Sequence, residues 1–216
     1  TFIFTKILLK EFEPVEILLF RFVLGFVILL LVYPGRMKGT DRRQEFIFAA
    51  AGLCGVCLYY LLENIALTYT LASNVGVIVS VSPFFTAIFN RIFGEKERLK
   101  ARFFLGFAVA MAGIGLISFW GTKVEVSPVG DLLSLAAAVV WACYSILTRK
   151  ISKFGYPTVQ TTRRIFAYGI IFMLPTLVFF DFQLGLSRFT KPENLLNILF
   201  LGVGASAMCF VTWNFA

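Results

Sequence analysis

The chain has 216 residues, of which 59% are hydrophobic and 15% are charged, and its formal net charge is +8. Soluble domains carry about 25% charged residues, so this composition excludes an ordinary soluble enzyme, a disordered chain and a nucleic-acid-binding domain. The sequence has no histidine, which is the commonest metal ligand and the commonest proton carrier at neutral pH. We therefore expect a membrane protein with no catalytic residues, no metal site and no cofactor.

Apolar segments long enough to cross a bilayer recur along the chain. A helix needs about 20 mostly apolar residues to cross the hydrocarbon core. Segment 1–9 is too short and is typical of the second half of a helix, and the carboxyl end has no polar tail, so we expect a fragment of a longer protein. The segments of sufficient length are 15–33, 45–68, 73–93, 103–120, 131–149, 160–180 and 195–216. They predict an all-α integral membrane protein in which about eight helices are present, the first one partial.

Lysine and arginine are distributed unevenly between alternate loops. The loops on one side hold Arg36, Lys38, Arg42, Arg43, Arg91, Lys96, Arg98, Lys100, Arg102, Arg149, Lys150 and Lys153. The loops on the other side hold only Lys10, Lys123, Arg188 and Lys191. Cytoplasmic loops carry the excess of basic residues in membrane proteins. We therefore expect loop 34–44 to be cytoplasmic, in a bacterial-type inner (plasma) membrane.

The sequence repeats itself after five predicted helices. The aligned pairs share residue type or charge: at an offset of 143, Lys6 and Arg149, Pro14 and Pro157, and Arg21 and Arg164; at an offset of 150, Gly52 and Gly202, Asn64 and Asn214, and Ala66 and Ala216. Because five is odd, the second copy enters the membrane in the opposite orientation, and inverted repeats are typical of transporters. We place the repeats at 1–121 and 122–216, the second ending after its third helix.

Several motifs follow one another in a characteristic order. They are LFRF around Arg21, Ala66-Leu67 with Tyr69-Thr70, Ser80 to Pro83, Gly94-Glu95, Gly106 through Gly113 to Gly115, and the run at 130–150. In this order and spacing they resemble the drug/metabolite transporter superfamily, specifically its EamA-type family. The resemblance implies ten helices in two inverted five-helix repeats, export or exchange of a small organic solute, and no ATP hydrolysis. Against that pattern, the chain lacks most of helix 1 and all of helices 9 and 10.

Segment 73–93 carries a stripe of small or polar residues. The stripe consists of Ser73, Gly76, Ser80, Pro83 and Ala87. Pro83 has no amide proton for the Val79 carbonyl and therefore predicts a kink. The stripe either lines a cavity with a gating joint at the proline or packs tightly against another helix. The resemblance favours the cavity, which makes Ser80 and Pro83 candidate substrate residues.

Charged residues also lie inside the predicted spans. Glu63 and Arg21 fall in the outer third of the predicted membrane, near Lys6, where an unpaired charge is costly. Either Glu63 forms a static pair with Arg21 or Lys6, or it takes up protons or binds a cationic group of the substrate. Arg164, the equivalent of Arg21, either contributes to the cavity or, with Arg163, anchors the chain to lipid headgroups.

Aromatic and polar side chains at helical spacing complete the candidate cavity. They are Tyr59, Tyr60, Asn64, Trp141, Tyr144, Ser145, Trp213 and Asn214. A single aromatic residue in a membrane helix more often packs or faces lipid, but together these residues suit an amphipathic metabolite, an amino acid or a cation. Gly106 and Ala110 form a small-xxx-small motif that serves either internal packing or a homodimer.

These features predict a secondary-active transporter that moves a small organic metabolite, such as an amino acid or a similar amphipathic solute, outward by alternating access. The expected partners are this small-molecule substrate, the lipid bilayer and protons as the candidate coupling ion. An uncoupled facilitator or exchanger is the alternative within transport. An integral-membrane enzyme would need a cluster of His, Asp or Cys at helical spacing, which the sequence does not contain.

Overall fold

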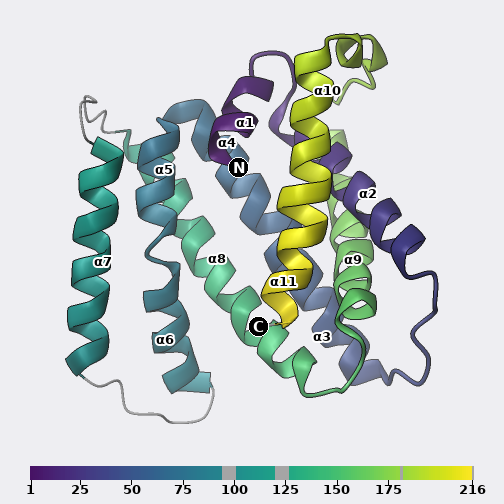
Figure 1. Cartoon of the computed structure of the whole chain (residues 1–216), viewed down its shortest axis with the longest axis horizontal. Coiled ribbons are helices and arrows are strands. Elements are labelled where there is room, and N and C mark those ends of the chain that lie inside the picture. Colours follow the sequence, from purple (N-terminus) through teal and green to yellow (C-terminus); the bar gives the residue numbers. More distant parts are fainter. Residues whose placement is uncertain (94–100, 120–126, 181, 216) are drawn as a thin grey trace.

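The computed structural model describes residues 1–93, 101–119, 127–180 and 182–215, and all secondary structure in these residues is helical (Figure 1). The α-helices are α1 (Phe2–Leu8), α2 (Pro14–Val32), α3 (Arg42–Gly52), α4 (Tyr59–Tyr69), α5 (Ala72–Val79), α6 (Ser82–Phe93), α7 (Ala101–Phe119), α8 (Pro128–Ser152), α9 (Thr158–Phe179), α10 (Pro192–Leu199) and α11 (Cys209–Phe215). Two π-helices, η1 (Leu53–Leu58) and η3 (Phe200–Met208), continue α3 into α4 and α10 into α11, and a 3₁₀-helix, η2 (Leu186–Thr190), precedes α10.

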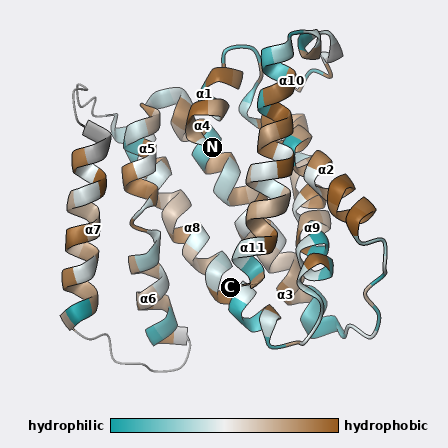
Figure 2. Cartoon of the chain, in the orientation of Figure 1, coloured by the Kyte–Doolittle hydropathy of each residue, from teal (hydrophilic) through white to brown (hydrophobic). Residues whose placement is uncertain are grey.

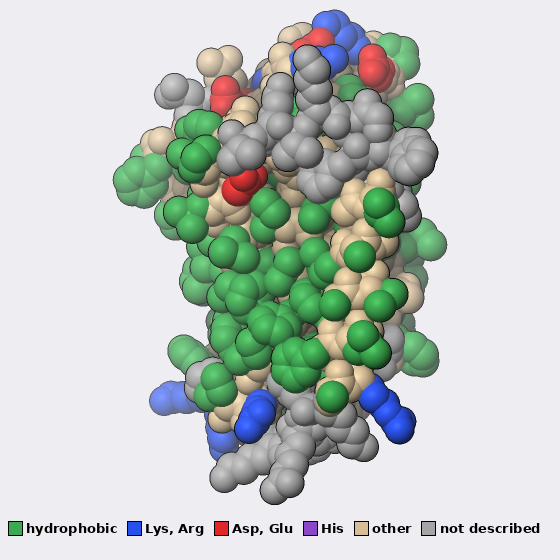
Figure 3. Space-filling view, turned by 90° about the vertical axis from the view of Figure 1, so that its left-hand side faces the viewer, with side chains coloured by type: hydrophobic (Ala, Val, Ile, Leu, Met, Phe, Trp, Pro, Cys, Tyr) green, Lys and Arg blue, Asp and Glu red, His purple; other side chains and the backbone are tan. Residues whose placement is uncertain are grey.

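Six helical spans in the described residues are long and apolar enough to cross a membrane. They are Pro14–Val32, Arg42–Tyr69, Ala72–Ile92, Pro128–Ser152, Thr158–Phe179 and Pro192–Phe215, and Ala101–Leu116 is a shorter apolar helix. Hydrophobic residues cover the spans, and hydrophilic residues gather near the loops (Figure 2). The space-filling view shows a hydrophobic band between two charged ends, with basic side chains at the lower one (Figure 3). The predicted all-α membrane fold is confirmed.

The two ends of the bundle differ, and we name them by their loops. The basic end carries the loops at 33–41 and 153–157, and the opposite end carries those at 9–13, 70–71 and 182–191. Most of the predicted loop at 94–102, and Lys123, lie outside the described residues. The core sits between α2, α3, α4, α8, α9 and α11, where Phe22, Phe166 and Phe210 are buried against one another.

Helices α2 and α9, which align at the offset of 143, pack together in opposite directions. At the start of α2, Glu16 contacts Arg188, which follows the end of α9. At the end of α2, the Tyr33 carbonyl accepts a hydrogen bond from Arg163, near the start of α9. Equivalent helices with opposed directions are what an inverted repeat requires.

The third helix of each repeat crosses a neighbour at a glycine, which directly precedes η1 in the first repeat and lies within η3 in the second. A Cβ atom on Gly52 would lie 2.6 Å from the Ile165 carbonyl oxygen of α9. A Cβ atom on Gly202 would lie 2.6 Å from the Leu24 side chain of α2. Glycine therefore permits both close crossings. Short π-helical segments inside α-helices are often found at functional sites.

Local sequence explains two details of the spans. Helix α8 begins at Pro128, three residues before the predicted 131–149, because the Ser127 hydroxyl accepts a hydrogen bond from the Gly130 amide and proline suits the first helical position. The kink predicted from Pro83 is present, since α5 ends at Val79 and α6 begins at Ser82.

Candidate functional site

A cavity lies near the basic end, between α6, α8 and α11. Its larger part has a volume of about 420 Å³ and is lined by Ser145, Thr148, Arg149, Ser152, Trp213, Asn214 and Phe215. A second part, of about 280 Å³, shares two of these residues and is lined by Ser82, Pro83, Thr86, Ala87, Asn90, Trp141, Ser145 and Trp213. We call the two parts the basic-end cavity. Its described lining residues include hydroxyls, amides, indoles and one arginine, and none of them is acidic.

An aromatic layer lies behind this cavity. The Trp141 ring is 5.6 Å from Trp213 and 4.7 Å from Tyr59, measured between ring centroids. The Tyr59 ring is in turn 4.7 Å from Tyr60. Tyr59, Tyr60 and Tyr144 are buried, so these three predicted residues lie in the layer behind the cavity and do not line it in this conformation.

Asn64 and Asn214, which align in the two repeats, each tie a third helix to a second helix. The Asn64 amide donates to the Pro14 carbonyl at 3.0 Å. The Asn214 amide donates to the Thr162 hydroxyl at 2.9 Å and accepts from the Tyr144 hydroxyl at 2.9 Å. Only the second of the two asparagines also lines the cavity.

Arg21 and Glu63 are buried in the half of the bundle toward the opposite end. The Arg21 side chain is fully buried, its Nε donates to the Ser206 hydroxyl at 3.0 Å, and its guanidinium carbon lies 4.2 Å from the centre of the Tyr60 ring. Both terminal guanidinium nitrogens, and Oε1 of Glu63, have no hydrogen-bond partner among the described residues.

Neither static pair considered for Glu63 forms. Among the described residues, no lysine or arginine nitrogen lies within 4.0 Å of the Glu63 carboxylate. Lys6 instead donates to the carbonyls of Leu67 and Thr70 and so caps the end of α4. The Oε1 atom of Glu63 therefore keeps hydrogen-bonding capacity that the described residues do not use.

Arg164 lies away from the cavity and near the basic end. Its guanidinium makes two hydrogen bonds to Glu45, at 2.6 Å and 3.1 Å, and the Tyr168 hydroxyl donates to the same carboxylate. Arg163 donates to the carbonyls of Tyr33 and Gly35. In this structure both arginines join α9 to the first repeat, in contrast to the headgroup anchoring weighed from sequence.

The predicted stripe on segment 73–93 has two different surroundings. Pro83 and Ala87, in α6, line the basic-end cavity together with Ser145 of α8. The Ser80 hydroxyl bonds back to the Gly76 carbonyl of its own helix at 2.6 Å. The structure therefore brings the α6 half of the stripe to the cavity and leaves Ser80 outside its lining.

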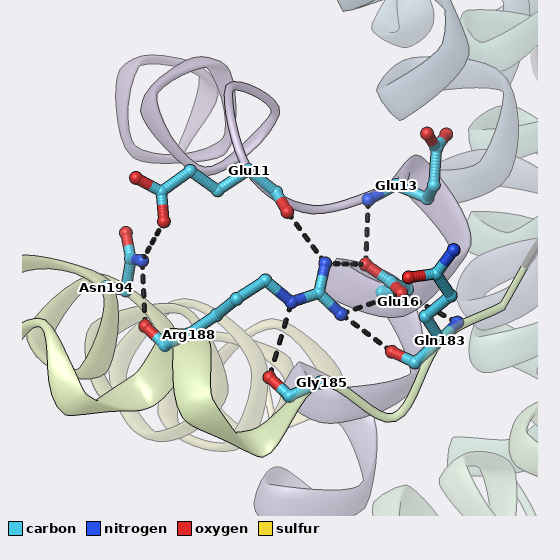
Figure 4. Close-up of polar contacts among 7 residues, drawn as sticks. All are labelled: Glu11, Glu13, Glu16, Gln183, Gly185, Arg188 and Asn194. Atoms are coloured by element: carbon cyan, nitrogen blue, oxygen red, sulfur yellow. Dashed lines mark hydrogen bonds and ion pairs between the residues drawn. The ribbon is translucent and has the colours of Figure 1, made fainter.

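Sequence reasoning missed a polar network at the opposite end (Figure 4). The Arg188 guanidinium donates to both carboxylate oxygens of Glu16, at 2.7 Å and 2.9 Å. It also donates to the carbonyls of Glu11, Gln183 and Gly185. The hydrogen bonds that Arg188 donates to Glu16 raise the pKa of Arg188 above its usual value. An acidic residue three positions into a span was the available signal, because a buried carboxylate needs a partner.

Helices long and apolar enough to span a membrane, equivalent helices with opposed directions, and a polar cavity at one end of the bundle are together typical of a membrane transporter. The EamA-like transporter family model matches residues 1–119 and 128–216. The chain therefore belongs to the EamA-like transporter family.

The chain is similar to several transporters along its whole length. An uncharacterized transporter of Archaeoglobus fulgidus is 31% identical over 222 residues, which cover 100% of this chain and 74% of that protein. The uncharacterized transporter YyaM of Bacillus subtilis is 26% identical over 229 residues, which cover 99% of this chain and 72% of that protein. A crystal structure with 19% identity and a TM-score of 0.71 covers 98% of this chain and 75% of its own, and it shows the fold alone.

Proposed function

We propose that the protein is a secondary-active transporter that exports a small amphipathic organic solute, such as an amino acid, by alternating access. The observation that supports this most is the difference between the two halves of the bundle. A polar cavity lies near the basic end, whereas Arg21 and Glu63 are buried behind an aromatic layer. With the basic end in the cytoplasm, the cavity faces the compartment from which an exporter takes its solute.

The cavity lining favours neutral or zwitterionic solutes over simple cations. Its main volume of about 420 Å³ falls within the usual range of roughly 300–1,000 Å³ for small-molecule sites. Trp141 and Trp213 offer flat apolar walls, and Ser145 and Asn214 offer hydrogen-bonding groups. Arg149 is the only charged residue among the described lining residues, so no described carboxylate is available there to hold a cation.

Glu63 is the proposed site of proton coupling. Its carboxyl is buried inside a span, and one of its oxygens has no partner among the described residues. Ionisable residues in that situation mark proton or ion pathways in membrane proteins. An uncoupled facilitator would not need this group to change its charge.

Site-directed labelling in vesicles tests alternating access. We would introduce Ser145→Cys, in the cavity, and Thr68→Cys, exposed near the opposite end, after replacing Cys54, Cys57, Cys143 and Cys209. An impermeant maleimide should label the first variant from the cytoplasmic side and the second from the outside. Counterflow into proteoliposomes with amino acids, nucleobases and quaternary amines then identifies a transported class. That solute should change the labelling of the cavity variant, and labelling indifferent to side and solute would contradict the proposal.

A further inference from the structure

Arg21 differs from the arginines that fasten the ends of the bundle. Arg188 makes five hydrogen bonds to the described residues around it. Arg163 uses both terminal nitrogens on carbonyls, and Arg164 forms a two-bond contact with Glu45. Arg21 is more deeply buried than any of them, yet its two terminal nitrogens have no partner among the described residues.

The carboxylates show the same division. Glu16 accepts hydrogen bonds from Arg188, from the Gln183 amide and from the Glu13 amide. Glu45 accepts from Arg164 and Tyr168. Glu63 is as buried as Glu16, but its Oε1 atom is unpartnered. A purely structural charge at this depth would have its hydrogen bonds satisfied, because an unsatisfied buried charge costs free energy.

We propose that Arg21 and Glu63 form a binding site for a zwitterionic solute. The carboxylate of the solute binds the terminal nitrogens of Arg21, and its ammonium group binds Glu63. This assignment rests on the proposed function, since it names the class of solute that the transporter carries.

The surroundings of Arg21 hold its guanidinium ready for a planar anion. Ser206, in the π-helix η3, fixes the Nε atom, and the Tyr60 ring lies against the guanidinium. The two terminal nitrogens that remain form one edge of the planar fork, the geometry with which arginine binds a carboxylate through two parallel hydrogen bonds.

Charge balance supports the pairing of both groups with one ligand. Arg21 and Glu63 interact electrostatically, yet they are not within ion-pair distance of each other. A zwitterion supplies a negative group for the first residue and a positive group for the second without adding net charge to the membrane interior. A cation or an anion alone would leave one of the two residues uncompensated.

The route to this site passes the aromatic layer. Trp141 lines the basic-end cavity and contacts Tyr59, whose helix also carries Glu63. A solute that enters the cavity therefore meets these rings before it reaches the charged pair. Movement of the layer would join the cavity to the site.

Three related probes test the assignment on the purified intact protein: L-phenylalanine, 2-phenylethylamine, which lacks the carboxylate, and 3-phenylpropionate, which lacks the ammonium group. Binding is measured by titration calorimetry and transport by counterflow in proteoliposomes. In Arg21→Gln we expect affinity for L-phenylalanine and 3-phenylpropionate to fall about 10- to 100-fold, the usual effect of losing a charged hydrogen bond, with 2-phenylethylamine unaffected. In Glu63→Gln the losses should fall on L-phenylalanine and 2-phenylethylamine.

Matched variants protect this test against a general loss of folding. Arg21→Lys keeps the charge but loses the planar fork, and it should weaken carboxylate binding by a smaller factor. Arg164→Gln removes the equivalent arginine of the second repeat, which is engaged by Glu45, and should leave all three affinities unchanged. Equal losses for every probe, or a transported solute without an anionic group, would overturn the assignment. If the transported solute has no anionic group, the proposed transport function is still supported. If there is no counterflow and no solute-dependent labelling, the proposed function is rejected as well.

Discussion

Arg21 and Arg164 occupy aligned positions in the two repeats, at the offset of 143. The two side chains differ in exposure and in ion pairing. The Arg164 side chain is 42% exposed and contacts Glu45 at 2.6 Å. Arg21 is fully buried, and no carboxylate in the described residues lies within ion-pair distance of it. The repeat has kept a basic residue at both positions, and the fold has given a carboxylate partner to only one.

This difference separates charges that pair with one another between helices from charges that have no ion-pair partner among the described residues. The first group lies near the two ends of the bundle, where α2 or α3 is joined to α9 or to the segment that follows it. The second group lies between, beside the aromatic layer. Helices α2 and α9 are therefore joined at both ends, whereas no ion pair between described residues joins helices around Arg21 and Glu63.

The largest expected effect on stability is at the opposite end. In Arg188→Ala, the buried Glu16 carboxylate, whose side chain is 1% exposed, loses its ionic partner. Removing one member of a buried pair costs about 3–5 kcal/mol of folding free energy, and we expect the lower value because Arg188 is partly exposed. Thermal unfolding in detergent measures it. Lys191→Ala, which removes an exposed ion pair with Glu11, is the control, and equal destabilisation by both variants would contradict the structural role of Arg188.

A smaller loss of stability is expected from a substitution at the basic end. Glu45→Gln removes the carboxylate that joins Arg164 and Tyr168. Because Arg164 is 42% exposed, solvent screens the pair, and we expect a loss of about 1 kcal/mol. Counterflow at saturating solute should stay within a factor of about two, a small change in barrier. A loss of transport as large as that of Arg21→Gln would erase the distinction between the two arginines.

The sequence predicted the spans because hydrophobicity along the chain reports the membrane directly, and it predicted opposed repeats from the residue matches at the offsets of 143 and 150. It also predicted that Arg21 and Glu63 lie together in the outer third of the membrane. It did not predict that the two side chains stay outside ion-pair distance, because that separation depends on how two helices cross, which local sequence does not report.

Other features were beyond local patterns. The contact between Glu16 and Arg188 joins residues 172 positions apart and depends on the path of the 182–191 loop. The π-helices change the helical period over only a few residues, a slip that apolar sequence does not reveal. The sequence did not predict the partner of Arg164 for a related reason, since Glu45 lies on a different helix. Only the cavity and the lipid headgroups were predicted as surroundings of this arginine.

Glu63→Gln should change stability less than Arg188→Ala or Glu45→Gln, and it should affect the coupling of transport to a pH gradient. The amide keeps the shape of the side chain and removes a charge that has no ion-pair partner within the described residues. We therefore expect the free energy of unfolding to change by less than about 1 kcal/mol. Among the described side chains, those of Arg21 and Tyr59 interact with the carboxyl. If Glu63 carries the coupled proton, the variant should still exchange the zwitterion weakly while uptake driven by a pH gradient is lost. An unchanged pH dependence would leave Glu63 without the coupling role.

The smallest expected effect is the acid response of the exposed pair formed by Glu11 and Lys191. The hydrogen bond from Lys191, helped by Asn194, holds the pKa of Glu11 below its usual 4.5. Because the pKa is lower in the folded protein, the contribution to stability is complete above about pH 4.5 and is lost as the pH falls through the folded value. Lys191→Ala should therefore lower the thermal midpoint slightly at pH 7, and the difference from the wild type should shrink toward pH 3. A difference that stays constant with pH would show that Lys191 acts through packing and not through its charge, and the paired charges at this end would then lose one example.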